Sequence, residues 1–515
     1  MRIYLETFGC QMNELDSQLV RGQLSCLGHT FTEDPSIAEV LLYNTCSVRE
    51  HAEQKAYSRI GIVGQRKRAG EHLILGVIGC MAERDGLDML VRHPQIDLLC
   101  GPGELDKLPA LIDNASRTHD LPRPDRAALA GNKSRRTATL AAADDDLESL
   151  DLARMFDPST DDGRHRSAYV RITRGCNKFC TYCVVPRTRG AEVHRPPDHI
   201  VAECRRLADA GVIEVTLLGQ TVNHYSYTHG VAVTLSGTEA PQVGAAVRPN
   251  GRNDSGSHAT ARKTTFAGLL RRIHEEVPSL RRIRFLTSYP RDFGLDALEA
   301  MRDCPRICPY LHAPAQSGSN RILRLMNRGY EVEEYVDFAH RAIETVPDLC
   351  LAGDFIVGFP TETEADFAAT VDLVQRLPFK NNFIFKYSPR PGTVAFDRLP
   401  DDIPDEVKRA RNNRLLAVQA GVSARVHAGW VGRTVDVLVD TVRSVPKANP
   451  APNGVELRWE RPVGRWQVVG RTAGDLIVTA PFDAGNPSHL IGTIVQVQLE
   501  AARPLLLLGT LLTDG

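Results

Sequence analysis

The chain of 515 residues carries 62 Lys and Arg against 63 Asp and Glu, and 42% of its residues are hydrophobic. This length exceeds one hydrophobic core and predicts about three or four domains. The balanced charge excludes a globally basic nucleic-acid-binding protein, so an RNA partner would need local patches. The sequence lacks a signal-peptide core and an apolar run of about eighteen residues, so we expect no membrane span. We expect a cytoplasmic location, where the 12 cysteines stay reduced and available to metal.

The N-terminal region, residues 1–117, alternates short apolar segments with polar-faced helical stretches. The expected strands are Arg2–Thr7, Val40–Asn44, His72–Ile78 and Ile96–Leu99. Strands separated by helices predict a doubly wound parallel sheet.

Three cysteines, Cys10, Cys46 and Cys80, each follow one of these strands. Ligands of such sheets bind beyond the carboxyl ends of the strands, so the three thiolates should meet at one edge. The alternative is that these three cysteines are buried thiols that only pack in the core. The shared position on successive strands favours a cluster site with three thiolates.

Two stretches interrupt the regular pattern. Residues 118–165 combine proline, glycine and charge runs and are expected to be a linker; the basic Lys133–Arg136 within it is assigned no function. Residues 226–262 are rich in Gly, Ser, Thr and Asn without apolar periodicity. We expect them to be a disordered insertion in one βα connection.

The central region, residues 166–428, repeats a strand, loop and helix pattern. Six such units are fewer than the eight of a closed barrel, so we expect a partial (βα)6 barrel whose post-strand loops form the active site. The expected strands are Ala168–Ile172, Glu214–Leu218, Arg282–Leu286, Tyr310–His312, Leu351–Val357 and Asn382–Phe385.

The first of these loops contains Cys176, Cys180 and Cys183 at C-x-x-x-C-x-x-C spacing. Three thiolates in one loop suit an iron–sulfur cluster, which normally takes four cysteines, and leave one iron open. Zinc prefers paired C-x-x-C elements and a fourth ligand, and no second pair lies nearby. The spacing therefore favours a cluster with one open coordination site.

The tail, residues 429–515, changes to short alternating strands with Gly, Pro and Asn turns, which predict a small antiparallel β-barrel. Such barrels can bind single-stranded RNA through basic and aromatic residues. The tail carries Arg433, Arg458, Arg461, Arg465 and Arg471 together with Trp430, Trp459 and Trp466. A purely structural barrel is the alternative, because Lys and Arg are balanced by Asp and Glu.

The motifs together resemble the radical S-adenosylmethionine (SAM) methylthiotransferases over nearly the whole chain. The matching stretches are Thr7–Ser17, Asn44–Ala52, Gly175–Gly190, Leu217–Asn223, Gln316–Tyr330, Asp354–Pro360 and Tyr387–Thr393. The branch that modifies N6-(dimethylallyl)adenosine in tRNA is most similar, and the tail resembles its RNA-binding TRAM domain. The chain departs from the family pattern at Glu83, Arg174 and Thr221, and its Val469–Arg471 region is a loose TRAM match.

The resemblance implies two [4Fe–4S] clusters. One, on Cys176, Cys180 and Cys183, would cleave SAM to a 5′-deoxyadenosyl radical; the other, on Cys10, Cys46 and Cys80, would carry a sulfur that is methylated by another SAM. The implied product is a methylthio group on C2 of the adenosine at position 37, next to the anticodon. The implied partners are the tRNA anticodon stem-loop and an electron donor such as flavodoxin or ferredoxin, whereas the sulfur donor stays open.

Two other functions stay open at this stage. A methylthiotransferase for threonylcarbamoyl-adenosine or for a ribosomal-protein aspartate would share the chemistry. An RNA-binding iron–sulfur scaffold or sensor would lack catalysis.

Polar residues of the post-strand loops are candidate contacts for SAM or the adenosine. Gln220, Asn223 and Ser317 are such candidates, with loop capping as an equal alternative. Four cations are candidates to neutralise phosphates or the SAM carboxylate: Arg187, Arg189, Arg328 and Lys386. The remaining cysteines lack matching spacing and are expected to be packing thiols: Cys26, Cys100, Cys204, Cys304, Cys308 and Cys350.

Overall fold

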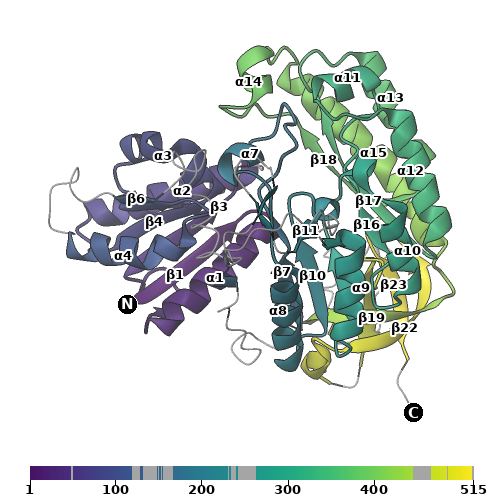
Figure 1. Ribbon diagram of the computed structural model, residues 1–515, viewed down its shortest axis with the longest axis horizontal. Helices are drawn as coiled ribbons and strands as arrows, with labels where there is room; N and C mark the ends of the chain where they lie inside the picture. The colour runs from purple at the N-terminus through teal and green to yellow at the C-terminus, as the bar shows by residue number, and fades with distance from the viewer. Residues whose placement is uncertain are drawn as a thin grey trace, which may run out of the picture.

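The computed structural model comprises an N-terminal α/β sheet, a central partial barrel and a small C-terminal β-barrel (Figure 1). This arrangement confirms the predicted fold class. The structure describes residues 1–47, 50–118, 128–130, 148, 150–151, 154, 166–229, 231–233, 239–241, 262–444, 466–483 and 485–512.

The N-terminal sheet has six parallel strands in the order β2-β1-β3-β4-β5-β6. Their bounds are β1 (Arg2–Phe8), β2 (Thr30–Phe31), β3 (Val40–Thr45), β4 (Ile74–Gly79), β5 (Leu98–Cys100) and β6 (Ala128–Ala130). Helices α2 (Glu50–Arg68) and α3 (Cys80–Arg92) pack on one face, and α1 (Gln11–Cys26) and α4 (Leu108–Arg117) on the other. Both faces are covered, which explains why β3 and β4 are buried at every position.

The strand order reverses between β1 and β3, because β2 lies on the outer side of β1. Ligands of doubly wound sheets bind at this switch point, beyond the carboxyl ends of the strands. The residues that follow β1 and β3 are therefore the positions at which a ligand is expected.

Strand β6 lies inside the range 118–165, which we expected to be a linker. Its Ala-Leu-Ala sequence is too short to show a strand pattern, and it forms by pairing with the edge of β5. Most of the other residues of this range lie outside the described part of the chain.

The central domain has six parallel strands, as predicted, in two ladders: β7-β10-β15 and β16-β17-β18. They are β7 (Ser167–Arg171), β10 (Glu214–Leu218), β15 (Arg282–Phe285), β16 (Tyr310–His312), β17 (Cys350–Val357) and β18 (Phe379–Lys386). A parallel bridge between Ile283 and Ile307 joins the ladders. The main outer helices are α8 (Pro197–Asp209), α9 (Phe266–Glu276), α10 (Leu295–Asp303), α12 (Val332–Thr345), α13 (Glu364–Arg376) and α15 (Asp405–Ala428).

Shorter elements lie in the connections of the central domain. They are β8 (Thr173–Arg174), β9 (Val193–His194), α7 (Val185–Thr188), η2 (Val222–His224), η3 (Pro290–Asp292), α11 (Asn320–Leu325) and α14 (Val394–Arg398). The expected insertion begins and ends in a ladder of β11 (Ser226–Thr228) with β14 (Lys263–Thr265). Strands β12 (Val231–Val233) and β13 (Glu239–Pro241) pair within it, and its other residues up to 261 lie outside the described part, so the expected disorder stays a prediction.

The C-terminal barrel closes in the order β19-β20-β21-β23-β22. Its strands are β19 (Thr434–Ser444), β20 (Trp466–Arg471), β21 (Ile477–Phe482), β22 (Ile494–Ala502) and β23 (Leu507–Leu511). All pairs are antiparallel except β21 with β23, which run parallel. The alternating pattern of the tail predicts strands at Thr434–Val439, Gly454–Trp459, Trp466–Gly470, Asp475–Ala480 and Gly492–Leu499, so β23 was not predicted. The predicted strand Gly454–Trp459 lies outside the described residues.

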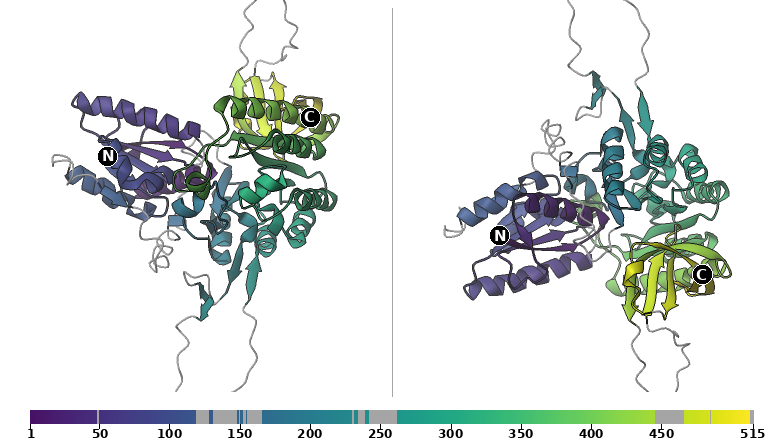
Figure 2. Two further views of the ribbon diagram at one scale, coloured as in Figure 1. Left: turned by 90° about the horizontal axis from the view of Figure 1, so that it is seen from above. Right: turned by 90° about the horizontal axis from the view of Figure 1, so that it is seen from below.

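The barrel packs against the amino ends of the central strands (Figure 2). Tyr310 and Cys350, which begin β16 and β17, share an apolar cluster with Val437 and Val478 of the barrel. Arg284 donates hydrogen bonds to the carbonyls of Thr472 and Ala473. The barrel therefore contacts β16 and β17 where these strands begin, at the end opposite to their post-strand loops.

Candidate functional site

The three N-terminal cysteines meet at the switch point of the sheet. Cys10 precedes α1, Cys46 follows β3, and Cys80 begins α3. A Cβ on Gly9 would lie 2.9 Å from the Cβ of Cys46, so only glycine permits this approach. The structure thus brings together the three residues that the sequence predicted to meet.

The electrostatics favour the thiolate form of Cys10. A hydrogen bond with Cys46 lowers the pKa of Cys10 to about 6, aided by the positive charge of Arg189. Burial raises the pKa of Cys80, and the charge of Arg189 opposes that rise. Thiolates are the form that binds metal, so Arg189 stabilises the ligand state of this site.

Two buried asparagines fix the backbone around the set. The Asn13 amide donates to Asn44 Oδ1 at 2.8 Å, and the Asn44 amide donates to the Asn13 carbonyl at 2.7 Å. Both side chains are fully buried. They link the start of α1 to the end of β3, so Cys10 and Cys46 are held in register.

The central cysteines occupy the loop between β8 and α7. Gly175 begins the loop with φ 65°, and a Cβ there would lie 2.0 Å from the Ala191 carbonyl oxygen. Burial, together with the charges of Cys180 and Cys176, raises the pKa of Cys183 to about 12. Metal binding at this set must therefore release protons.

Arg328 lies against this set. Its Nη1 is 3.5 Å from Cys180 Sγ, and its Nη2 donates to the Pro314 carbonyl at 2.9 Å. The guanidinium also lies over the rings of Tyr289 and Tyr330, at 4.6 and 5.1 Å from their centroids. The predicted SAM contact Arg328 is thus placed as a cation beside the thiols.

Neither set suits a single metal ion. Within the described residues, the structure contains no group of three His, Cys, Asp or Glu side chains that converges on one ion. A zinc ion needs its ligands about 2 Å from one point. In an iron–sulfur cube each thiolate binds a different iron, so the sulfurs stand farther apart. The donors are all cysteine sulfurs, and a buried arginine lies beside each set, which fits iron–sulfur clusters.

The N-terminal domain covers part of the inner face of the central barrel. Met12, Leu15 and Leu19 of α1 pack on Leu218 of β10, with Leu286 at the edge of the same cluster. α1 therefore packs on the inner side of the first ladder, with Cys10 beside it.

Buried ion pairs link the two domains. Asp16 of α1 accepts hydrogen bonds from Arg189 at 2.8 Å and from Arg171 at 3.4 Å. Glu53 of α2 accepts a hydrogen bond from Arg390, in the loop after β18, at 2.8 Å. All of these side chains are at least nine-tenths buried except Glu53, which is 11% exposed. The N-terminal domain is therefore held against the active-site loops on two sides.

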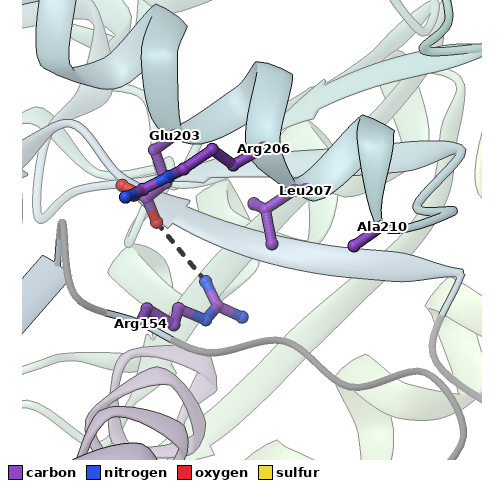
Figure 3. A pocket seen from close by; sticks show the side chains of 5 residues that line it. All are labelled: Arg154, Glu203, Arg206, Leu207 and Ala210. Atoms are coloured by element: carbon purple, nitrogen blue, oxygen red, sulfur yellow. Dashed lines mark ion pairs between the residues drawn. The ribbon is translucent and has the colours of Figure 1, made fainter.

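Residues of the expected linker complete this interface. Glu148 accepts hydrogen bonds from Arg195, and Asp151 accepts them from Arg171 and Arg174. Arg154 forms an ion pair with Glu203 of α8 at 3.5 Å, beside a small cavity of about 150 Å³ that Figure 3 shows. The cavity is lined by α8 residues and Arg154 and includes none of the six cysteines.

The sequence matches two families. Residues 170–374 match the Radical SAM superfamily, and residues 2–101 match a family described as Uncharacterized protein family UPF0004. The tRNA-2-methylthio-N(6)-dimethylallyladenosine synthase of Rhodopirellula baltica is 39% identical over 514 residues, which cover 99% of this chain and 95% of the relative. The synthase of the same name from Paraburkholderia xenovorans is 37% identical over 511 residues, covering 99% and 97%.

The chain belongs to the tRNA-2-methylthio-N(6)-dimethylallyladenosine synthase family. Members of the radical SAM superfamily use SAM and a [4Fe–4S] cluster. A solved radical S-adenosylmethionine methyltransferase, TsrM from Kitasatospora setae, aligns with a TM-score of 0.52 at 14% identity over 77% of each chain, a likeness of fold. None of the described helices has both the length and the apolar character needed to cross a membrane.

The candidate SAM contacts of this chain fall into two groups. Asn223 exchanges hydrogen bonds with the backbone of Tyr289, and Ser317 bonds to Thr370 and to the Ser319 amide. These two side chains support loops, as the capping alternative predicted. Gln220 is half-buried, and its amide makes no hydrogen bond to the rest of the described chain.

Other polar atoms at the carboxyl ends of the strands lack partners and were missed from the sequence. Thr173 Oγ1, Ser288 Oγ and Gln316 Oε1 are buried without a hydrogen bond among the described residues. Gln316 also has φ 72°, a conformation that costs energy in a non-glycine residue. Such orphaned groups beside the central cysteines fit a polar ligand such as SAM. In the sequence, the only sign that these three residues could contact a ligand is their position directly after strands.

The other predicted cations differ in their surroundings. Arg187 donates to the Gly392 carbonyl, whereas Lys386 is exposed at the end of β18. In the barrel, Arg433 pairs with Asp348 at 2.8 Å and Arg471 with Asp440 at 2.9 Å. Arg458, Trp459, Arg461 and Arg465 lie outside the described residues.

Proposed function

We propose that this chain transfers a methylthio group to C2 of N6-(dimethylallyl)adenosine at position 37 of tRNA. The observation that carries the proposal is the pair of three-cysteine sets, each at the carboxyl edge of its own parallel sheet and each beside a buried arginine. The sequence relationship to synthases named for this nucleoside supports the substrate.

The adenine C2–H is an unactivated aromatic position that no side-chain acid or base can functionalise. A cluster on Cys176, Cys180 and Cys183 with SAM, and a second on Cys10, Cys46 and Cys80, would supply the radical and sulfur chemistry when bound. The protein supplies position and charge: Arg328 faces the central set, and Arg189 faces the N-terminal set.

Two sets serve the reaction better than one. A cluster with three protein ligands has one open iron, which cannot hold SAM and a sulfur at the same time. The two sets lie on domains that Asp16, Arg189 and Arg390 hold together, so the relative position of the two sets is fixed.

We propose that residues 1–117 form the domain that carries the second cluster. Residues 166–428 form the radical SAM domain, and residues 429–515 form a TRAM-like RNA-binding domain.

Further partners belong to the same proposal. A cluster that cleaves SAM needs one electron, which a donor such as flavodoxin or ferredoxin would deliver.

The proposed polar contacts for SAM are Gln220 and the buried Ser288 and Gln316, whose side chains have polar atoms without a hydrogen bond among the described residues. Lys386 is the proposed contact for a phosphate of the RNA.

The direct test is mass spectrometry of nucleosides from tRNA incubated with reconstituted protein, SAM, reductant and sulfide. We expect the 2-methylthio derivative of dimethylallyladenosine to form, and tRNA with unmodified adenosine at position 37 to stay unchanged. A product on threonylcarbamoyl-adenosine, or SAM cleavage without any product, would refute the proposed substrate.

A further inference from the structure

Helix α1 packs on the inner side of the first ladder and not on that of the second ladder, β16-β17-β18, in the described structure. Strand β18 pairs with β17 in a register that sets Phe383 beside Asp354 and Phe385 beside Ile356. Both phenylalanines are exposed, by 47% and 38%, although parallel strands normally bury both faces. Phe383 and Phe385 are two residues apart, so these two exposed aromatic side chains lie on the same face of β18.

The ring of Phe383 is held in place by a contact with His312 of the neighbouring strand β16. The His312 ring meets Phe383 edge-on, with centroids 6.1 Å apart and planes at 79°. His312 Nε2 lies 3.0 Å from Asp354 Oδ1, which fixes the imidazole. An exposed ring with a fixed neighbour is preorganised to receive a flat partner, because little side-chain freedom is left to lose on binding.

A chain of contacts links this face to the central set of cysteines. His312 ends β16, and Pro314, two residues later, accepts the hydrogen bond of Arg328, which also contacts Cys180. On the other side, Cys10 lies at the edge of the cluster that covers the first ladder. A group bound on Phe383 would therefore lie on the ladder that leads to Arg328 and Cys180.

The chemistry of the face fits a nucleobase with an apolar substituent. Enzymes that modify a base inside RNA extrude it and hold it by stacking on aromatic side chains. Lys386, the residue after Phe385, is exposed and ends the strand, where a phosphate of the same nucleotide can reach it. An alternation of aromatic rings and a cation is typical of single-stranded RNA sites.

We propose that Phe383 and Phe385 form the binding site for the prenylated adenine, with the dimethylallyl group packed on the two rings. The proposal rests on the proposed function and names the residues that recognise its substrate. The apolar substituent distinguishes this base from unmodified adenosine, so these rings would decide substrate specificity.

The test measures binding of two anticodon stem-loop RNAs to reconstituted protein by fluorescence anisotropy. One RNA carries dimethylallyladenosine at position 37, and the other carries adenosine. The wild-type protein should prefer the prenylated RNA at least about tenfold, since even one buried methylene discriminates by about that factor. In Phe383→Ala/Phe385→Ala both RNAs should bind more weakly, the prenylated RNA by the larger factor, so that the preference falls towards one. Phe383→Leu, which keeps an apolar side chain, should retain part of the preference.

Leu416→Ala is the matched control, because Leu416 is 45% exposed on α15. It should keep the full preference. Equal iron content and thermal unfolding of all variants show that they are folded. A double variant that keeps the wild-type preference would overturn the site and leave the proposed function standing. A wild-type protein without any preference would instead refute the proposed substrate.

Discussion

The Asp16 carboxylate accepts a hydrogen bond from the Arg189 guanidinium at 2.8 Å, across 173 positions of sequence. Asp16 belongs to α1, whereas Arg189 follows α7 of the central domain. The opposing charges of Asp16, Cys80 and Cys10 raise the pKa of Arg189 well above its ordinary value, although burial opposes this. The central domain therefore contributes a charge to the thiol site of the N-terminal domain, and neither domain forms that site alone.

Replacing Asp16 by Asn should destabilise the protein by about 3 kcal/mol, because the buried guanidinium of Arg189 would lose its carboxylate partner, whereas Arg171 would keep its pair with Asp151. Urea unfolding of the variant and the wild type measures the difference. Asp113→Asn is the control, since the Asp113 side chain is 56% exposed and its pair with Arg117 is a surface pair. The control should lose less than about 1 kcal/mol; equal losses in both variants would contradict a structural role for the buried pair.

Changing Cys176, Cys180 and Cys183 together to Ala should halve the iron content of anaerobically reconstituted protein, from about eight to about four atoms. The variant should also produce no 5′-deoxyadenosine from SAM. Iron analysis and chromatography of the reaction measure both effects. Cys26→Ala, at an exposed thiol outside both sets, should leave both values unchanged. A triple variant that still cleaves SAM would disprove the assignment of the central set.

The insertion should be dispensable for folding. The His229 amide donates to the Arg262 carbonyl at 2.9 Å, so the chain leaves and returns at adjacent positions. Replacing residues 230–261 by Asn-Gly, which favours a two-residue hairpin turn, should keep both clusters and shift the thermal midpoint by only a few degrees. Absorbance of the clusters and calorimetry provide the readouts. Loss of a cluster would show that the removed residues pack against a site.

His224 should make stability depend on pH. Burial lowers its pKa, but hydrogen bonds to Glu192 and Asp292 outweigh burial and raise the pKa above the ordinary value. A raised pKa in the folded state stabilises the protein below about pH 6.5, and this contribution disappears as pH rises through the raised value. The difference in unfolding free energy between the wild type and His224→Gln should thus be largest at acidic pH. A difference independent of pH would mean that His224 stays neutral in the folded protein.

Sequence patterns predicted the main strands of the two α/β domains and the place of the cysteines after them, because both depend on local features; the role of the cysteines as cluster ligands stays a prediction. Strand Glu214–Leu218 and the positions of Cys10, Cys46 and Cys80 follow from burial and from strand ends. The ion pairs of Asp16 with Arg189 and of Glu53 with Arg390 could not be predicted, because they join residues 173 and 337 positions apart. Ala128–Ala130 was missed since its strand forms only by pairing with β5.

The most direct test of the two-site account replaces Cys10, Cys46 and Cys80 by Ala and measures two products of one reaction. Each set lies on a domain with its own apolar core, so the central cluster should persist. We predict that the variant still forms 5′-deoxyadenosine under reductant and makes no methylthiolated nucleoside in tRNA. Methylthiolation that survives the loss of these three thiols would contradict the account.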